Sequence, residues 1–212
     1  MYVLKFFKMN HLRPKYWLSH IPLPILESYR FKKIEVRKRR RQEIIANFSS
    51  AFEDLKEETA LVYLYLGNKH PSHEQITVWD KQGRAFKISL KEVPFILQRR
   101  AALIYPYVDS ILASEGEGKA IGALLSILTL IKQRCAKGYV DLDPGISSNF
   151  GFVGGRPVQI DIGRLVKDDA IVETGATLRE VRRVGKKLSL WVRQNHPELA
   201  ASFEKELEKF IQ

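Results

Sequence analysis

The sequence predicts an α+β fold, because short strand-like runs gather before residue 91 and helical patterns dominate after it. Hydrophobic residues make up 45% and charged residues 28% of the 212 residues, a composition typical of folded globular proteins. This length suffices for one domain of two lobes. We therefore expect a first lobe over residues 1–90, with strands and one long helix, and a mainly helical second lobe over residues 91–212.

Strand and helix patterns alternate in the first ninety residues. Residues 2–7 (YVLKFF) form a short β-type run, and residues 27–58 contain neither proline nor glycine, which predicts one long charged helix. Strand-forming residues return at 61–66 and 76–79. A Lys-Gln-Gly turn then leads into residues 85–90, whose apolar side chains alternate, so these last two runs are predicted to form a hairpin.

The second lobe begins with two predicted helices. The first covers residues 92–112 and should break or bend near Pro106. The second covers residues 119–137 and is apolar nearly all round, which is typical of a buried helix. The single cysteine, Cys135, lies in this helix and is expected to be a buried thiol that cannot form an internal disulfide.

The remainder of the chain is predicted to form a hairpin followed by helices. Residues 150–162 contain a glycine-pair turn between two runs of alternating apolar residues. Thr177 and Glu180 have the spacing of a capping box, which predicts the start of a helix. A last helix is predicted over residues 197–211.

Positive charge is concentrated in one segment. The chain has a formal net charge of +11, and the segment Arg30–Arg41 contains eight basic residues. Such a block can contact nucleic-acid phosphates or an anionic membrane face, or it can be the solvated face of a long helix. No stretch reaches the roughly 20 apolar residues that a membrane span needs, and the N-terminus lacks signal-peptide features. We therefore expect a soluble cytoplasmic protein.

A cluster of acidic and amide residues follows the apolar helix. Residues 139–163 read YVDLDPGISSNFGFVGGRPVQIDIG, with Asp141 and Asp143 in the first part, Asn149 before the hairpin and Asp161 after it. In this order the segment resembles the catalytic loop, short hairpin and metal-binding turn of the protein-kinase-like fold. The compact C-terminal part is more similar to bacterial small-molecule and lipopolysaccharide kinases than to eukaryotic protein kinases.

The resemblance implies a site for ATP and Mg²⁺. Phosphoryl transfer requires a carboxylate that orients the attacking hydroxyl and hard oxygen ligands for the metal. By this resemblance Asp141 is the catalytic base, with Asp143 as the alternative. Asn149 and Asp161 are the implied metal ligands.

The first strand and the long helix extend the resemblance. The run that ends at Lys5 is similar to the V-A-I-K strand of kinases, which implies that Lys5 contacts phosphate. Its implied partner is a glutamate of the long helix: Glu43, or otherwise Glu35 or Glu57. The chain would then be an ATP-dependent phosphotransferase or a degenerate pseudokinase. The alternative is a non-catalytic basic protein that binds nucleic acid or an anionic surface.

The first strand raises a separate expectation. Kinase-like first lobes place two strands before the lysine strand, and here no residues precede residues 2–7 to form them. The first lobe is therefore expected to have a reduced sheet with an apolar edge, and such edges invite pairing. We expect self-association or an internal segment such as 14–26 to cover this edge, or upstream residues of a longer natural protein to extend it.

Overall fold

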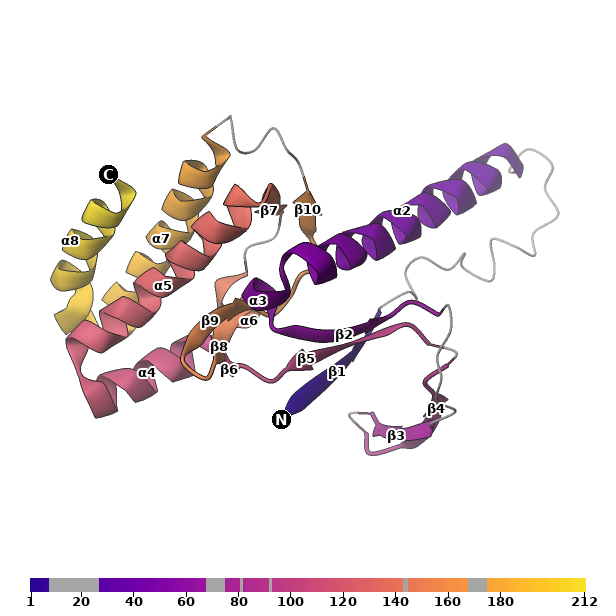
Figure 1. Cartoon of the computed structure of the whole chain (residues 1–212), viewed down its shortest axis with the longest axis horizontal. Coiled ribbons are helices and arrows are strands. Elements are labelled where there is room, and N and C mark those ends of the chain that lie inside the picture. The colour runs from indigo at the N-terminus through magenta and orange to yellow at the C-terminus, as the bar shows by residue number, and fades with distance from the viewer. Residues whose placement is uncertain (8–26, 68–74, 81, 92, 143–144, 168–174) are drawn as a thin grey trace.

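The computed structural model describes residues 1–7, 27–67, 75–80, 82–91, 93–142, 145–167 and 175–212 (Figure 1). Strands and one long helix occupy one side of the molecule, and a layer of helices occupies the other. We call the described residues of 1–99 the sheet region and those of 102–212 the helical region. The predicted α+β class is confirmed. None of the described helices combines the length and the apolar character needed to cross a membrane.

The main sheet of the sheet region is antiparallel and has the strand order β1-β5-β2. Its strands are β1 (Tyr2–Phe6), β5 (Phe95–Arg99) and β2 (Leu61–Tyr65). β1 is thus the edge strand among the described residues, as predicted, and segment 14–26, which we expected to cover it, lies outside them. The boundary expected at residue 90 falls before the central strand β5.

The predicted helix over residues 92–112 is wrong in its first half. This part instead forms β5 and the short strand β6 (Ala102–Leu103), and helix α4 (Ile104–Glu115) begins only afterwards. The run Phe-Ile-Leu in β5 is flanked on both sides by strands, and pairing with them outweighs the helical pattern. Pro106 lies in the first turn of α4, where its missing N–H has no helical partner to lose, so it breaks nothing.

The long charged helix is present but ends earlier than predicted. Helix α2 (Glu27–Asp54) is followed by the short helix α3 (Lys56–Thr59). Figure 1 shows α2 passing over the sheet and extending beyond it at its N-terminal end. Its C-terminal end packs into a core cluster with residues of both regions: Ala51, Leu55, Leu61, Ile96, Tyr139, Ile162 and Leu165. A separate hairpin, β3 (Gln75–Trp79) and β4 (Ala85–Ser89), confirms the predicted one.

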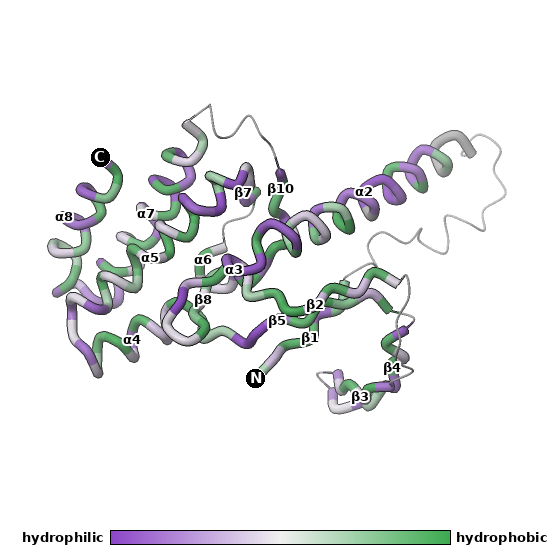
Figure 2. The backbone as a smooth tube through the Cα atoms, in the orientation of Figure 1, coloured by the Kyte–Doolittle hydropathy of each residue, from purple (hydrophilic) through white to green (hydrophobic). Residues whose placement is uncertain are grey.

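The helical region contains the largest core. Helices α5 (Glu117–Ala136), α7 (Ala176–Asn195) and α8 (Ala200–Ile211) pack with α4, and a short 3-10 helix, η4 (Pro197–Leu199), precedes α8. α5 is the buried central helix that its apolar sequence predicted, whereas Figure 2 shows the outer part of α2 as largely hydrophilic. The predicted capping box is wrong, because α7 begins after Gly175 with no side-chain cap.

Two small sheets shape the segment that carries the motif. β6 and the predicted hairpin, β8 (Phe150–Val153) and β9 (Arg156–Gln159), form one sheet in the order β6-β8-β9. β7 (Tyr139–Asp141) pairs antiparallel with β10 (Leu165–Lys167), and the short helix α6 (Ile146–Asn149) lies between β7 and β8. These pairings bring the first and last residues of the motif together.

Candidate functional site

A cavity of about 680 Å³ lies where β1 and α2 of the sheet region face the motif of the helical region. Four of the six residues implied by the resemblance line it: Lys5, Asp141, Asn149 and Asp161. They come from β1, the end of β7, the end of α6 and the residues after β9. Sequence reasoning thus predicted a set of residues that the fold brings together. The fifth residue, Asp143, lies outside the described residues.

Lys5 contacts the motif segment through its side chain. Its Nζ donates a hydrogen bond of 2.8 Å to the carbonyl oxygen of Ile160, the residue before Asp161. Burial lowers the pKa of the Lys5 ammonium, and the nearby carboxylate of Asp161 opposes this shift. Lys5 therefore places a partly desolvated positive charge beside Asp161.

The predicted helix partner of Lys5 is wrong. Glu43 does not line the cavity, because its exposed carboxylate lies 3.4 Å from Nε of Arg39 on another face of α2. The side chains that α2 presents to the cavity are Arg40, Ile44 and Phe48, spaced four residues apart as one helix face requires. The alternatives also lie elsewhere: Glu35 is exposed and Glu57 pairs with Arg156 at 3.4 Å.

Asp141 is held by a buried polar network that the sequence did not reveal. Its Oδ2 accepts a hydrogen bond of 2.7 Å from Nε2 of Gln159 in β9. Gln159 Oε1 accepts in turn from Arg134 of α5, which also forms an ion pair with Glu180 of α7. A guanidinium has donors only, so Arg134 fixes the amide oxygen toward itself and leaves the NH₂ group for Asp141.

The charged members of this network are almost fully buried. Relative exposures are 1% for Arg134, 2% for Asp141 and 4% for Glu180. The available signal was a basic residue inside an otherwise apolar helix, since a buried arginine needs an acidic partner. Glu180, which the sequence assigned to a helix cap, is that partner.

Asn149 and Asp161 flank the β8–β9 hairpin and line the same cavity. The backbone N–H of Ile160 donates to the carbonyl oxygen of Asn149 at 2.6 Å, which joins the two ends of the hairpin. Asp161 is exposed, and its Oδ1 accepts a hydrogen bond of 3.0 Å from the backbone N–H of Gly163. The two implied metal ligands therefore lie on the same cavity, at the two ends of one hairpin.

The oxygen atoms at this site suit a hard cation. Asp161 contributes a carboxylate and Asn149 an amide oxygen, which are ligands that Mg²⁺ accepts. Within the described ranges, no group of three or more His, Cys, Asp or Glu side chains is arranged to hold a metal alone. Mg²⁺ does not require such a group, because it usually combines one or two carboxylates with water and substrate phosphate.

Cations also line the cavity. Arg40 and Arg164 accompany Lys5, so three basic side chains face two carboxylates, Asp141 and Asp161. This balance favours an anionic ligand. No protein-family model, curated protein or solved structure matches the chain, so the geometry of the cavity carries the functional argument.

Proposed function

We propose that the chain is a kinase-like phosphotransferase that binds ATP and Mg²⁺ in this cavity, or a degenerate pseudokinase that binds ATP without transferring phosphate. The observation that carries the proposal is the convergence of four functional side chains from distant parts of the chain on one cavity: Lys5, Asp141, Asn149 and Asp161. These are the residue types that phosphoryl transfer uses, because it depends on positioning and on neutralising charge.

Each side chain has a role in the proposed reaction. Lys5 would contact the phosphates through its ammonium group, and Asn149 and Asp161 would hold Mg²⁺. Bound Mg²⁺ neutralises charge on the phosphates. Asp141 would accept the proton of the attacking hydroxyl and orient it, while Gln159 holds the carboxylate in place.

The arrangement of elements supports the same proposal. A small antiparallel sheet with a long helix stands on one side of the cavity, and a helical region that carries the motif stands on the other. This order suits a kinase-like two-lobe fold with a reduced first lobe. Among the described residues, no helix glutamate lines the cavity. This departure from the kinase pattern favours including the pseudokinase in the proposal.

The direct test is the binding of ATP with Mg²⁺, measured by isothermal titration calorimetry. We expect the wild-type chain to bind the complex and Asp161→Asn to weaken binding by about tenfold or more, since it removes a charged ligand. Glu115→Gln is the matched control, because this exposed carboxylate in α4 is remote from the cavity lining. Absence of binding to the wild-type chain would refute the proposal.

A second measurement separates the two forms of the proposal. Release or transfer of the ATP γ-phosphate, followed with labelled nucleotide, identifies an active phosphotransferase. An Asp141→Asn variant should then bind ATP like the wild-type chain but lose most of the turnover, typically a hundredfold or more for a general base (~10²–10⁴). Binding without turnover in the wild-type chain would identify a pseudokinase.

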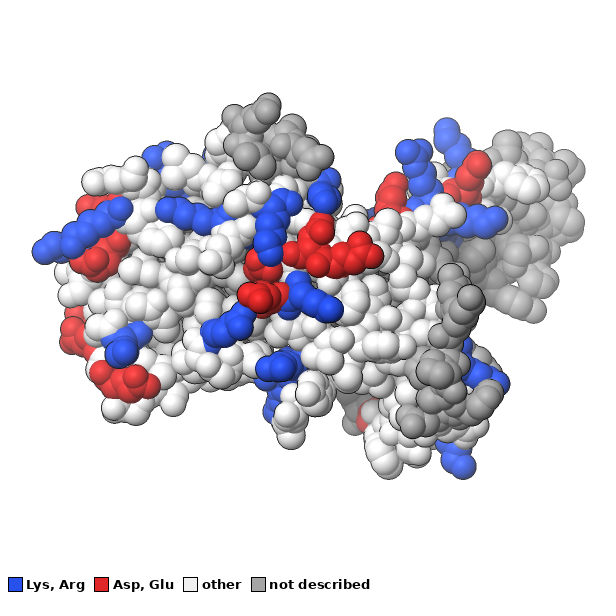
Figure 3. Space-filling model, in the orientation of Figure 1, with Lys and Arg blue, Asp and Glu red and all other residues white. Residues whose placement is uncertain are grey.

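The exposed face of α2 favours one alternative function, a basic surface that contacts nucleic acid or another anionic surface. Nearly all described side chains of residues 31–40 are exposed, and Arg39 is 81% exposed. Figure 3 shows basic side chains projecting from this part of the molecule. The test is the salt dependence of nucleic-acid binding, which neutralising Lys38 and Arg39 should make less steep. An unchanged slope would argue against this function.

A further inference from the structure

The cavity-facing side of α2 carries an arginine where the resemblance implied a glutamate. Arg40 lines the cavity together with Ile44 and Phe48, whereas Glu43 is turned toward Arg39. The guanidinium of Arg40 is exposed and has no ion pair or hydrogen bond with any described residue. A solvated cation that lines a cavity and has no partner among the described residues is available to a ligand.

The same helix face remains basic beyond the cavity. Steps of three and four residues lead from Arg40 back to Arg37 and Lys33, so these three positions share one side of α2. Arg37 is the one residue of 31–40 that is partly buried, which places this side toward the body of the molecule. We call Lys33, Arg37 and Arg40 the basic face of α2.

Acidic residues are rare in the part of α2 that carries this face. Between Arg30 and Arg41 the sequence contains eight basic residues and one acidic residue, Glu35. At the cavity itself, Lys5 is already engaged by Ile160 and Asp161. Arg40 therefore supplies positive charge to the cavity from the side of α2.

We propose that the cavity-facing end of this helix side is a phosphate-binding wall, with Arg40 as the residue that contacts the phosphate directly. The guanidinium fork pairs with two phosphate oxygens at once, which makes arginine well suited to phosphate groups. This inference deepens the proposed function, because it names a further binding residue and the ligand chemistry for the same cavity. The phosphate belongs either to the nucleotide or to a phosphorylated acceptor.

Calorimetric titration of metal-free tripolyphosphate tests the wall without requiring catalysis or Mg²⁺. Arg40→Gln should weaken binding by about tenfold or more, the usual effect of a lost charge-assisted hydrogen bond. Arg39→Gln is the matched control: it is the adjacent arginine, it lies on another face, and it should change binding by about twofold or less. Arg40→Lys should restore binding only in part, since lysine keeps the charge but not the fork. Thermal melts would verify that the variants fold.

Two further titrations identify the source of the phosphate. If Arg40→Gln weakens the binding of metal-free ATP as much as it weakens the binding of tripolyphosphate, the wall binds the nucleotide. The second titration adds a hexose phosphate to the chain after it has been saturated with a non-hydrolysable ATP–Mg²⁺ analogue. If Arg40→Gln weakens the binding of this hexose phosphate, the wall binds the acceptor.

The outcomes also separate this inference from the proposed function. The chain could bind tripolyphosphate through Arg40 and yet fail to bind ATP with Mg²⁺. This result would refute the proposed function and still support the phosphate-binding wall. Equal effects of Arg40→Gln and Arg39→Gln, or no binding of tripolyphosphate by the wild-type chain, would overturn the wall.

Discussion

The two sides of the cavity are built differently. The helical region packs its helices around one large core, and it holds Asp141 through the buried network of Gln159, Arg134 and Glu180. The sheet region has only two small clusters of buried side chains, and one of them includes three residues of the helical region. The sheet region therefore depends on its neighbour for part of its core.

This difference separates fixed groups from adjustable ones. Asp141 lies at the end of a network with almost no solvent access, so its carboxylate is pre-oriented. Arg40 belongs to an exposed stretch of helix and Lys5 to an edge strand. We expect the helical region to resist unfolding more strongly, and the sheet region to supply the movable contacts with a ligand.

The largest expected effect comes from breaking the buried ion pair. Arg134→Met removes the buried partner of Glu180 and leaves it only the longer ion pair with Arg183 at 3.8 Å. Losing one partner of a buried pair typically costs about 3–5 kcal/mol of unfolding free energy. Urea denaturation measures the loss. The double variant Arg134→Met/Glu180→Leu should recover most of it, because neither charge of this pair is then left in the core. A single variant that loses under about 1 kcal/mol would mean that Glu180 is not held as described.

The part of the site carried by one short segment could be predicted from the sequence. Asp141, Asn149 and Asp161 lie within 21 consecutive residues, and their order along a loop and hairpin determined the expectation. Lys5 was added to the predicted site because it is the single basic residue in the apolar strand over residues 2–7. All four residues line one cavity, and for the three in the short segment local order along the chain was enough to expect this.

Contacts across the chain could not be predicted in the same way. The ion pair of Arg134 with Glu180 joins residues 46 positions apart, and Glu180 had a plausible local role as a cap. To decide whether Glu43 or Arg40 faces the cavity, one must know how α2 is rotated about its axis. A helix that is charged all round gives no apolar stripe from which to read that rotation.

A matched substitution in each region measures the difference in packing directly. Leu128 of α5 is fully buried in the large core, and Leu4 of β1 is partly buried against a small cluster. Leu128→Ala should cost about 2–5 kcal/mol of unfolding free energy, because it removes methyl groups and leaves a cavity. Leu4→Ala should cost about 1 kcal/mol. Equal losses in urea denaturation would contradict the contrast between the two regions.

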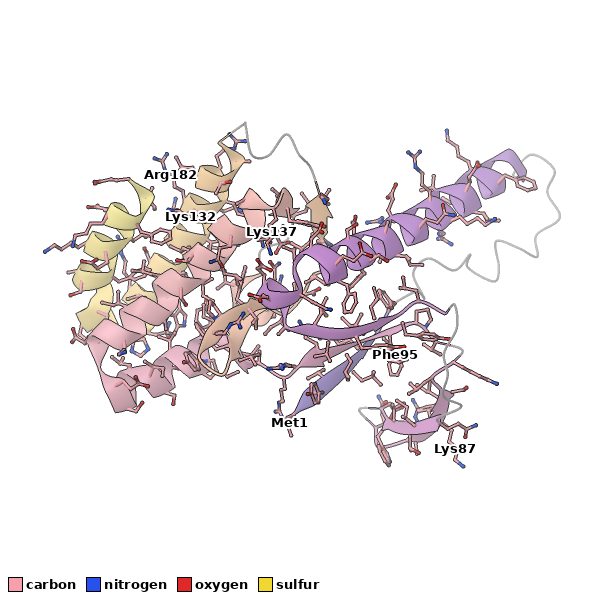
Figure 4. All side chains as sticks on the ribbon, in the orientation of Figure 1. Met1, Lys87, Phe95, Lys132, Lys137 and Arg182 are labelled. Atoms are coloured by element: carbon pink, nitrogen blue, oxygen red, sulfur yellow. The ribbon has the colours of Figure 1, made fainter. Side chains whose placement is uncertain are left out.

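A polar junction connects the regions and provides the smallest expected effect. Asp54, the last residue of α2, accepts hydrogen bonds from Lys167 of β10 at 2.8 Å and from the Tyr139 hydroxyl at 2.7 Å. Lys137, labelled in Figure 4, adds a bond of 2.9 Å to the Asp54 carbonyl and an ion pair of 2.6 Å with Glu58. These contacts tie the end of α2 to the helical region.

The junction should contribute stability that depends on pH. Hydrogen bonds from Lys167 and Tyr139 lower the pKa of Asp54 below its ordinary value. A lowered folded-state pKa means that the ionised form favours folding, so the contribution is present above the unfolded pKa of about 3.9 and is lost as the pH falls through the lowered value. Because the side chain is 36% exposed, solvent screens the pair and limits the expected loss in Asp54→Asn to about 1 kcal/mol at pH 7.

Unfolding by urea at a series of pH values tests this junction. The stability difference between the wild-type chain and Asp54→Asn should be constant from about pH 7 to 5. It should shrink as the pH falls below the unfolded pKa of about 3.9 and approach zero only below the lowered folded-state pKa, where both side chains are neutral. Glu115→Gln, which alters an exposed carboxylate of α4 that has no such partners, should show almost no difference across the range. A difference for Asp54→Asn that persists undiminished at low pH would assign its effect to side-chain packing. The carboxylate charge would then not be what joins the sheet region to the helical region.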